Sequence, residues 1–173
     1  MLPLELATPV AIRPATPADI AAIARIYNEG IEDRVATFET RARKGRDVAA
    51  WFDAALPFIV AVDLEDQVLG WARVSAASDR RVYRGVGEHG VYVARTARGH
   101  GAGRMLLEAL AEEAEAVGLY KLTSRVFAEN AASRAAHLAA GFEEVGVQRR
   151  HGKLDGVWKD CVLVERLLGE AAD

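Results

Sequence analysis

The feature that most constrains the fold of this chain is a glycine-rich turn between an apolar segment and an amphipathic one. The turn reads Arg98-Gly99-His100-Gly101-Ala102-Gly103 and directly follows the β-prone run Glu88–Arg95. After it, apolar residues recur at helical spacing as far as Gly118, which is typical of a helix C-terminal cap. A strand, a glycine turn and a helix start bring backbone N–H groups and the positive end of a helix to one point. The turn therefore predicts an anion-binding site.

The turn does not match the common nucleotide-binding signatures. A P-loop ends in Gly-Lys-Ser/Thr, which is absent here, and a Rossmann fingerprint would need a glycine where Arg104 or Leu106 stands. A Rossmann turn also follows the first strand of a parallel sheet, whereas this turn lies past the middle of the chain. From the turn alone, the remaining alternative is an ordinary strand-to-helix connection without a ligand.

The rest of the chain alternates between helical and β-strand patterns, which predicts one mixed α/β domain over residues 1–173, with residues 1–9 as an N-terminal arm. Strands are expected at residues 10–13, 58–62, 68–74, 88–95, 121–127, 142–147 and 157–167. Helices are expected after the cap at Thr16, over Asp47–Leu56, after the glycine turn, and over Asn130–Ala140. The segment Val35–Thr40 is β-prone and ends the first helix.

Composition narrows the class of protein. The 173 residues carry 22 Lys+Arg and 25 Asp+Glu, and 51% are hydrophobic, which is typical of a globular protein rather than a disordered one. A net charge of −3 argues against nucleic acid as the main partner. No apolar run approaches the ~20 residues of a membrane span, and no signal peptide is visible, so we expect a cytoplasmic protein.

The single cysteine and the four histidines predict no further chemistry of their own. Cys161 excludes an internal disulfide, and we expect it to be a small buried residue of a strand rather than a nucleophile. The histidines show no ligand spacing, so we predict no metal site. His89 should point to the opposite sheet face from its neighbour Glu88, because side chains alternate along a strand.

Two motifs identify a family resemblance. The turn has the form Arg98-x-x-Gly101-x-Gly103, and downstream the chain reads Asn130-x-x-Ser133-x-x-x-His137-x-x-x-Gly141-Phe142. Both patterns, in this order, resemble the acyl-CoA motifs of the GNAT superfamily of N-acetyltransferases. The resemblance implies the GNAT fold, a mixed sheet of about seven strands flanked by about four helices, and acetyl-CoA as co-substrate. It implies that acetyl-CoA is bound by Val91, Tyr92, Val93, Arg98, Gly99, His100, Gly101, Ala102, Gly103, Arg104, Asn130 and Ser133.

A closer resemblance extends from about Ile12 to Leu168. Stretches such as Ala36-Thr37-Phe38-Glu39-Thr40 and Glu88-His89-Gly90-Val91-Tyr92-Val93 look like the phosphinothricin/arsinothricin N-acetyltransferase branch, which includes methionine sulfone and sulfoximine acetyltransferases. This resemblance implies direct acetylation of the α-amino group of a small amino acid or toxic analogue, and a homodimer. It also implies catalytic roles for Glu88 and His137.

The reaction explains why these two residue types are needed. An α-ammonium group must lose a proton before it attacks the thioester, and the departing thiolate is better protonated as it leaves. Glu88 is the candidate proton acceptor, and His137, about two turns into its helix, is the candidate on the thiolate side. The alternatives are an exposed carboxylate at a strand end and a polar residue on a partly buried helix face.

On the substrate side the branch often carries Ser-Pro-x-Arg-x-Arg before a tyrosine. Here Ser78 stands in place of the first arginine, which puts phosphinothricin or arsinothricin specificity in doubt. Arg81 and Arg73 are the two candidates to compensate for Ser78. The substrate-binding residues that we expect are Phe38, Arg73, Ser75, Arg80 and Tyr83. Two other functions stay open: acetylation of protein N-termini or other amines, and a non-catalytic acyl-CoA sensor.

Overall fold

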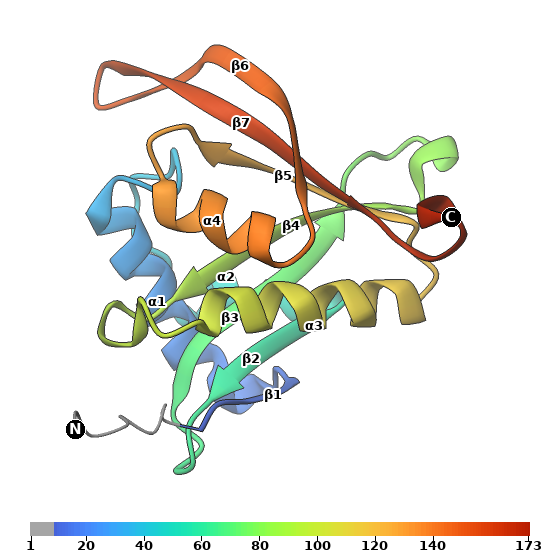
Figure 1. Cartoon of the computed structure of the whole chain (residues 1–173). Helices are drawn as coiled ribbons and strands as arrows, with labels where there is room; N and C mark the ends of the chain where they lie inside the picture. The colour runs from blue at the N-terminus through green and yellow to red at the C-terminus, as the bar shows by residue number, and fades with distance from the viewer. Residues whose placement is uncertain (1–8) are drawn as a thin grey trace, which may run out of the picture.

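The sheet has seven strands, as expected. The computed structural model describes residues 9–173, so nearly all of the proposed arm 1–9 lies outside the described residues. The strands are β1 (Ala11–Pro14), β2 (Phe58–Val62), β3 (Val68–Ala76), β4 (Val86–Val93), β5 (Lys121–Phe127), β6 (Glu143–Leu154) and β7 (Val157–Leu167). Their order is β1-β2-β3-β4-β5-β7-β6. Only the β4–β5 pair is parallel, so the sheet is mixed (Figure 1).

Four α-helices cover the sheet, two on each face (Figure 1). They are α1 (Ile20–Asp33), α2 (Gly45–Ala49), α3 (Ala102–Ala116) and α4 (Ala131–Ala139). Helices α1 and α2 pack on one face, and α3 and α4 pack on the other. No helix among residues 9–173 has both the length and the apolarity needed to cross a membrane.

Two local expectations were wrong. The helix expected over 47–56 is instead the short α2 followed by a 3-10 turn at Ala50–Asp53. It begins earlier because the carboxylate of Asp47 accepts a hydrogen bond from Lys44 N (2.8 Å), which makes Asp47 the third helical residue. Strand β6 runs on to Leu154 because its pairing with β7 continues up to the Asp155-Gly156 turn. The β-prone segment 35–40 lies beyond the end of α1 at Asp33, as expected, and itself forms no strand.

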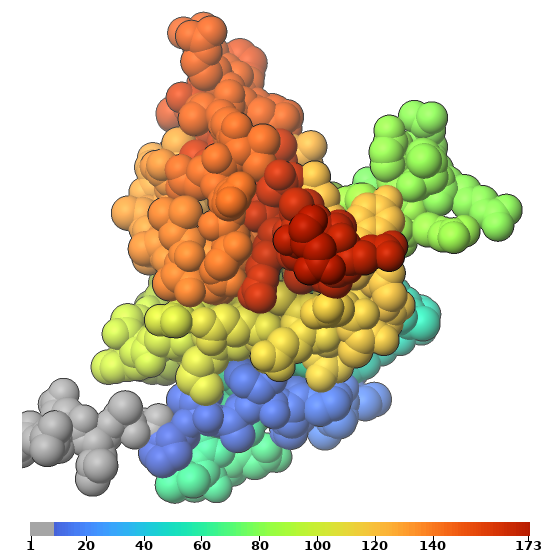
Figure 2. Space-filling model, turned by 45° about the vertical axis from the view of Figure 1, so that its right-hand side comes forward, coloured from blue at the N-terminus to red at the C-terminus, as the bar shows by residue number. Residues whose placement is uncertain are grey.

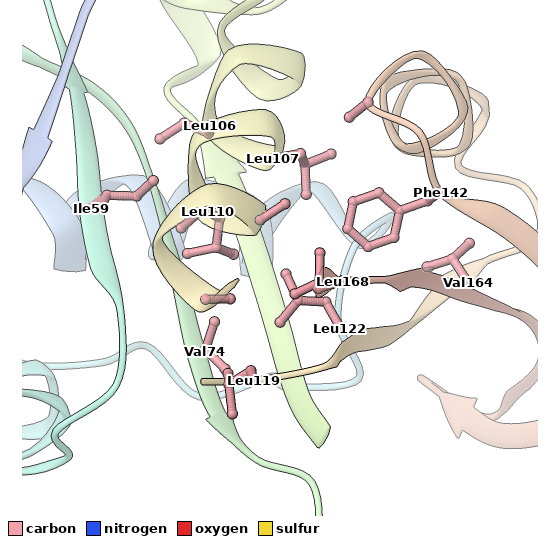
Figure 3. Packing of buried hydrophobic residues seen from close by; sticks show 14 of the residues in the cluster. Ile59, Val74, Leu106, Leu107, Leu110, Leu119, Leu122, Phe142, Val164 and Leu168 are labelled. Carbon is pink, nitrogen blue, oxygen red and sulfur yellow. The ribbon is translucent and has the colours of Figure 1, made fainter. Parts of the chain in front are cut away.

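The two larger apolar cores lie on opposite faces of the sheet. The first lies between the sheet and α3, where Leu106, Leu107 and Leu110 are fully buried against strand residues such as Val74 and Leu122 (Figure 3). The second core packs α1 and α2 against the other face, around Trp71, Tyr27 and Tyr92. Residues that alternate along β3 and β4 thus contact different helical layers, as their period of two requires.

The sheet is incomplete at its centre. Strands β4 and β5 pair only through Val86–Glu88 and Lys121–Thr123, although both strands continue well beyond these residues. The parallel strands therefore separate after Glu88. Two parts of the surface project from the body (Figure 2): the end of the β6–β7 hairpin and the segment of about residues 77–85.

Candidate active site

A cleft of about 620 Å³ opens where β4 and β5 separate. Its walls are the second half of β4, the facing part of β5, the glycine turn with the start of α3, and α4. The cleft continues through the sheet to the α1 face, where Gly30, Val35 and Ala36 line it. One groove thus extends from the predicted acyl-CoA motifs to the α1 side of the sheet.

The glycine turn has the geometry that an anion site needs. Gly99 and Gly101 have φ of +82° and +85°, a left-handed conformation that disfavours any other residue, and no atom lies within 4 Å of where their Cβ would be. Gly101 directly precedes Ala102, the first residue of the 15-residue helix α3. The expected strand, turn and helix start are therefore confirmed, and free N–H groups lie at the cleft.

Arg98, the arginine of the turn, holds the turn in place through hydrogen bonds to other parts of the chain. Arg98 donates from Nε to the carbonyl oxygen of Val93 (3.2 Å) and from Nη1 to Asp33 (2.5 Å). Arg95 binds the same carboxylate (2.8 Å), and the two guanidinium groups lower the pKa of Asp33. The turn is thus tied to the end of α1. His100 is exposed, and Arg104 pairs with Glu108 one helical turn later (2.7 Å).

The second motif forms helix α4 as its sequence predicts. The side chain of Asn130 accepts a hydrogen bond from Ser133 N (3.1 Å), which caps the helix. His137 lies in the last turn, 2% exposed, and its Nδ1 is 2.7 Å from the carbonyl oxygen of Ser133. Because a carbonyl oxygen only accepts, Nδ1 of His137 carries the proton.

A second histidine contacts the first. His89 Nε2 lies 2.9 Å from Nε2 of His137, and both rings pack against Phe142. Since the His137 proton is on Nδ1, His89 must donate from Nε2, and its own Nδ1 has no partner among the described residues. Burial and the neighbouring His137 lower the pKa of His89 to about 3, and burial also lowers the pKa of His137. Both imidazoles are therefore neutral near pH 7.

Glu88 lies on the opposite face of β4 from His89, as the alternation predicts. Its side chain is 46% exposed, and Oε1 is 4.0 Å from Nη1 of Arg125 on β5. Ser75 is its direct partner on β3 and donates from Oγ to the Glu88 carbonyl oxygen (3.4 Å). A partly hydrated carboxylate beside the opening can exchange protons with a ligand and with solvent.

The structure separates the predicted substrate residues into two groups. Arg73 and Ser75 share the Glu88 face of the sheet. Phe38 packs edge-on against Phe127 on that side (centroids 4.7 Å apart). Arg80 and Tyr83 belong to the projecting segment, where the Arg80 guanidinium lies over the Tyr83 ring at 5.3 Å. None of the five predicted substrate residues is among those that line the cleft, and the first group lies nearer to it because it shares the sheet face of Glu88.

The contribution of two residues could not be read from the sequence. Alternation along the strand predicts the sheet face of His89 but not its contact with His137 on α4. Arg125 belongs to none of the motifs, so its position beside Glu88 could not be predicted. Cys161 is buried in β7 as expected, and burial raises the pKa of its thiol. Within residues 9–173, no group of three or more His, Cys, Asp or Glu side chains could hold a metal ion.

Comparisons with known proteins agree with the geometry. Residues 22–142 match the Acetyltransferase (GNAT) family. The chain is 35% identical to the L-methionine sulfoximine/L-methionine sulfone acetyltransferase of Pseudomonas paraeruginosa, over 89% of this chain and 92% of that protein.

Two solved structures have the same fold. One is a phosphinothricin acetyltransferase of Sinorhizobium meliloti in complex with AcCoA (TM-score 0.88, 32% identity, 94% of this chain and 90% of that one). The other is a ribosomal-protein-alanine N-acetyltransferase from Brucella melitensis (TM-score 0.86, 34% identity, 91% of this chain and 99% of that one).

Proposed function

Since this chain belongs to the acetyltransferase (GNAT) family, we propose that it transfers the acetyl group of acetyl-CoA to the α-amino group of a small amino acid. The substrate class includes methionine sulfone, methionine sulfoximine, phosphinothricin and arsinothricin. The observation that carries the proposal is the single groove that runs from the glycine turn to Gly90 and Arg125, and Arg125 is 4.0 Å from Glu88. The names of the relatives at 32–35% identity support the amino-acid class.

The residues at the cleft fit acetyl-CoA. The N–H groups at the start of α3 suit a pyrophosphate, and the edge of β4 that β5 leaves unpaired, from Gly90 to Val93, suits the amide groups of a pantetheine arm. The side chain of Tyr92 stacks on Trp71 in the α1-side core, on the other face of the sheet from α3 and α4. Acetyl-CoA supplies an activated thioester, which an amine attacks at its carbonyl carbon while the C–S bond breaks.

We assign the proton acceptor role to Glu88. It takes a proton from the α-ammonium group, directly or through one water molecule, and leaves the amine free to attack. Its exposure lets the proton pass on to solvent, and the Arg125 guanidinium lies 4.0 Å from its carboxylate.

We assign the thiolate side to His137, which lines the cleft together with His89. In the observed arrangement both of its ring nitrogens are engaged, one by Ser133 and one by His89. Proton delivery to the leaving sulfur therefore requires the contact between the two histidines to open when the acyl donor is bound.

A thiol-release assay with acetyl-CoA and a panel of amino acids tests the proposal. The panel holds methionine sulfone, methionine sulfoximine, phosphinothricin, arsinothricin and the common amino acids, each with mass spectrometry of the product. We expect N-acetylation of one or more free amino acids that depends on Glu88. Acetyl-CoA binding without any acetylated product would instead favour an acyl-CoA sensor.

Acetylation of protein N-termini is the second candidate, because one relative of the same fold is named for it. Peptides that begin with alanine, assayed beside the free amino acids, distinguish the two functions. A clear preference for the peptides would overturn the amino-acid assignment.

We propose further that the protein is a cytoplasmic homodimer without a nucleic-acid or membrane partner. Large apolar side chains are exposed on the β6–β7 hairpin and support contact with a second copy: Val145, Val147, Val157 and Trp158. The relatives come from bacteria such as Pseudomonas paraeruginosa, and the acetyl-CoA of a bacterium is in its cytoplasm. Light scattering of the purified protein and cell fractionation test the two statements.

A further inference from the structure

Arg73 is a partly buried arginine that has no anion to bind. Its guanidinium lies 4.4 Å above the ring of Trp51, and within residues 9–173 no carboxylate lies at ion-pair distance from it. None of the side-chain hydrogen bonds of this region uses its N–H groups either. The stacking fixes the plane of the guanidinium and leaves its fork of donors available.

This is unusual among the partly buried arginines within residues 9–173. Arg13, Arg43 and Arg134, for example, all form ion pairs at 2.8 Å. Arg73 is removed from water without such compensation, and burial lowers its pKa, although a guanidinium stays charged at any physiological pH. A partly desolvated cation without a partner favours an incoming anion.

The register of the sheet shows where that anion would lie. Arg73 is directly opposite Gly90 on β4, and Glu88 is two residues before Gly90, so all three share one sheet face. A Cβ at Gly90 would meet only the ring of Tyr92, at 3.7 Å, within 4 Å. The missing side chain leaves space between Arg73 and Glu88, and Gly90 itself lines the cleft. Diagonal neighbours on one face have Cα atoms roughly 7–8 Å apart, which long side chains can bridge through a small molecule.

We propose that Arg73 binds the α-carboxylate of the amino-acid substrate while Glu88 accepts the proton of its α-amino group. The carboxylate and the amine are attached to the same carbon, so both must lie above Gly90 together. A bidentate arginine on one side and a carboxylate on the other fit this pair of groups. The inference rests on the proposed function and names the group that selects a free amino acid over other amines.

Arg80 is the competing candidate from the sequence. It lies over Tyr83 on the projecting segment, outside the sheet, whereas Arg73 is opposite Gly90 on the sheet face that carries Glu88. Neither arginine is among the residues that line the cleft itself. In the conformation described here, Arg73 is therefore the better placed of the two for a group bound beside Glu88.

The test crosses two substrates with three variants. The substrates are L-methionine sulfone and its primary carboxamide, which keeps the amine and the side chain but has no carboxylate charge. The variants are Arg73→Met, which keeps a long apolar stem over Trp51, Arg73→Lys, and Arg80→Met. We measure kcat/KM for both substrates, acetyl-CoA affinity by calorimetry, and the unfolding midpoint of each variant.

We expect the wild type to prefer the acid, and Arg73→Met to lose about 10- to 100-fold in kcat/KM for the acid alone, the loss typical of hydrogen bonds to a charged group. Lysine should restore part of this preference. Arg80→Met should keep it. Equal losses on acid and carboxamide, or loss of the preference in Arg80→Met instead, would overturn the assignment. A wild type that acetylates no free amino acid would reject the proposed function itself.

Discussion

The two faces of the sheet, at the point where β4 and β5 separate, present different chemical groups to a ligand. On the α3 and α4 face, the candidate acetyl-CoA groove consists of backbone groups, two left-handed glycines and a pair of buried neutral histidines. On the α1 and α2 face, the candidate acceptor site consists of charged side chains from separate strands, with Glu88, Arg73 and Arg125 around Gly90. The comparison shows that one half of the site depends on local chain geometry and the other on long-range register.

Replacement of Glu88 should have the largest effect, and it should fall on the acceptor face alone. Glu88→Gln keeps the size and polarity of the side chain but cannot accept the proton, so kcat should fall about 10²- to 10⁴-fold. Steady-state kinetics with calorimetry for acetyl-CoA checks this, and the acetyl-CoA affinity should not change. Turnover at the wild-type rate would remove Glu88 from the mechanism.

A bulky residue at Gly101 should affect the other face. Gly101→Val places a side chain among the N–H groups at the start of α3, and the loss of hydrogen bonds to a phosphate should weaken acetyl-CoA binding roughly 10- to 100-fold. Gly118→Val is the matched control, because Gly118 also has a left-handed φ (+90°) and open space around its Cβ. If both variants bind acetyl-CoA equally well in calorimetry, the turn is not the site.

The buried histidine pair should make the protein sensitive to mild acid. Because the pKa of His89 is lowered to about 3 in the folded state, the unfolded state binds the extra proton between about pH 6.5 and pH 3. Its contribution to stability is complete above pH 6.5 and falls by about 1.4 kcal/mol per pH unit below it. Urea unfolding at pH 5.0–7.5 should show this slope in the wild type.

His89→Gln should reduce the slope of the free energy of unfolding against pH by the equivalent of about one proton. Replacement of the exposed His151 by Gln should leave that slope unchanged. The window above pH 5 avoids the titration of carboxyl groups whose pKa is lowered, such as those of Asp19 and Asp33. A slope that is the same in wild type and His89→Gln would contradict a neutral buried His89.

The smallest expected effect concerns the hydrogen bond that crosses the opening. Ser124 on β5 donates from Oγ to the carbonyl oxygen of His89 on β4 (2.9 Å), beyond the last paired residues of these strands. Ser124→Ala should lower the free energy of unfolding by about 1 kcal/mol and also raise KM for acetyl-CoA. Thr123→Val removes a similar bond, to Val164 (3.1 Å), inside the β5–β7 pair, and should change stability alone. Identical KM values would show that the crossing bond does not shape the groove.

The sequence predicts the first half of the site better than the second. The seven strands, the glycine turn and the Asn130 cap follow from local patterns and are confirmed. The His89–His137 contact joins residues far apart in the chain, so periodicity alone cannot find it. Arg73 was one of several candidate arginines, and only its register opposite Gly90 distinguishes it. Local geometry is encoded locally, whereas a constellation of side chains depends on the finished sheet.

The short pairing between β4 and β5 has a thermodynamic consequence. It divides the sheet into two parts, β1–β4 and β5–β7. Helix α3 contacts all four strands of the first part, and helix α4 contacts β6 of the second part. A ligand in the groove contacts both halves and binds only when they are assembled. Binding should therefore stabilise the fold, by about 2.7 kcal/mol when the free ligand is at 100 times its Kd. In a cell with abundant acetyl-CoA, the ligand-bound protein should therefore resist unfolding more than the free protein does.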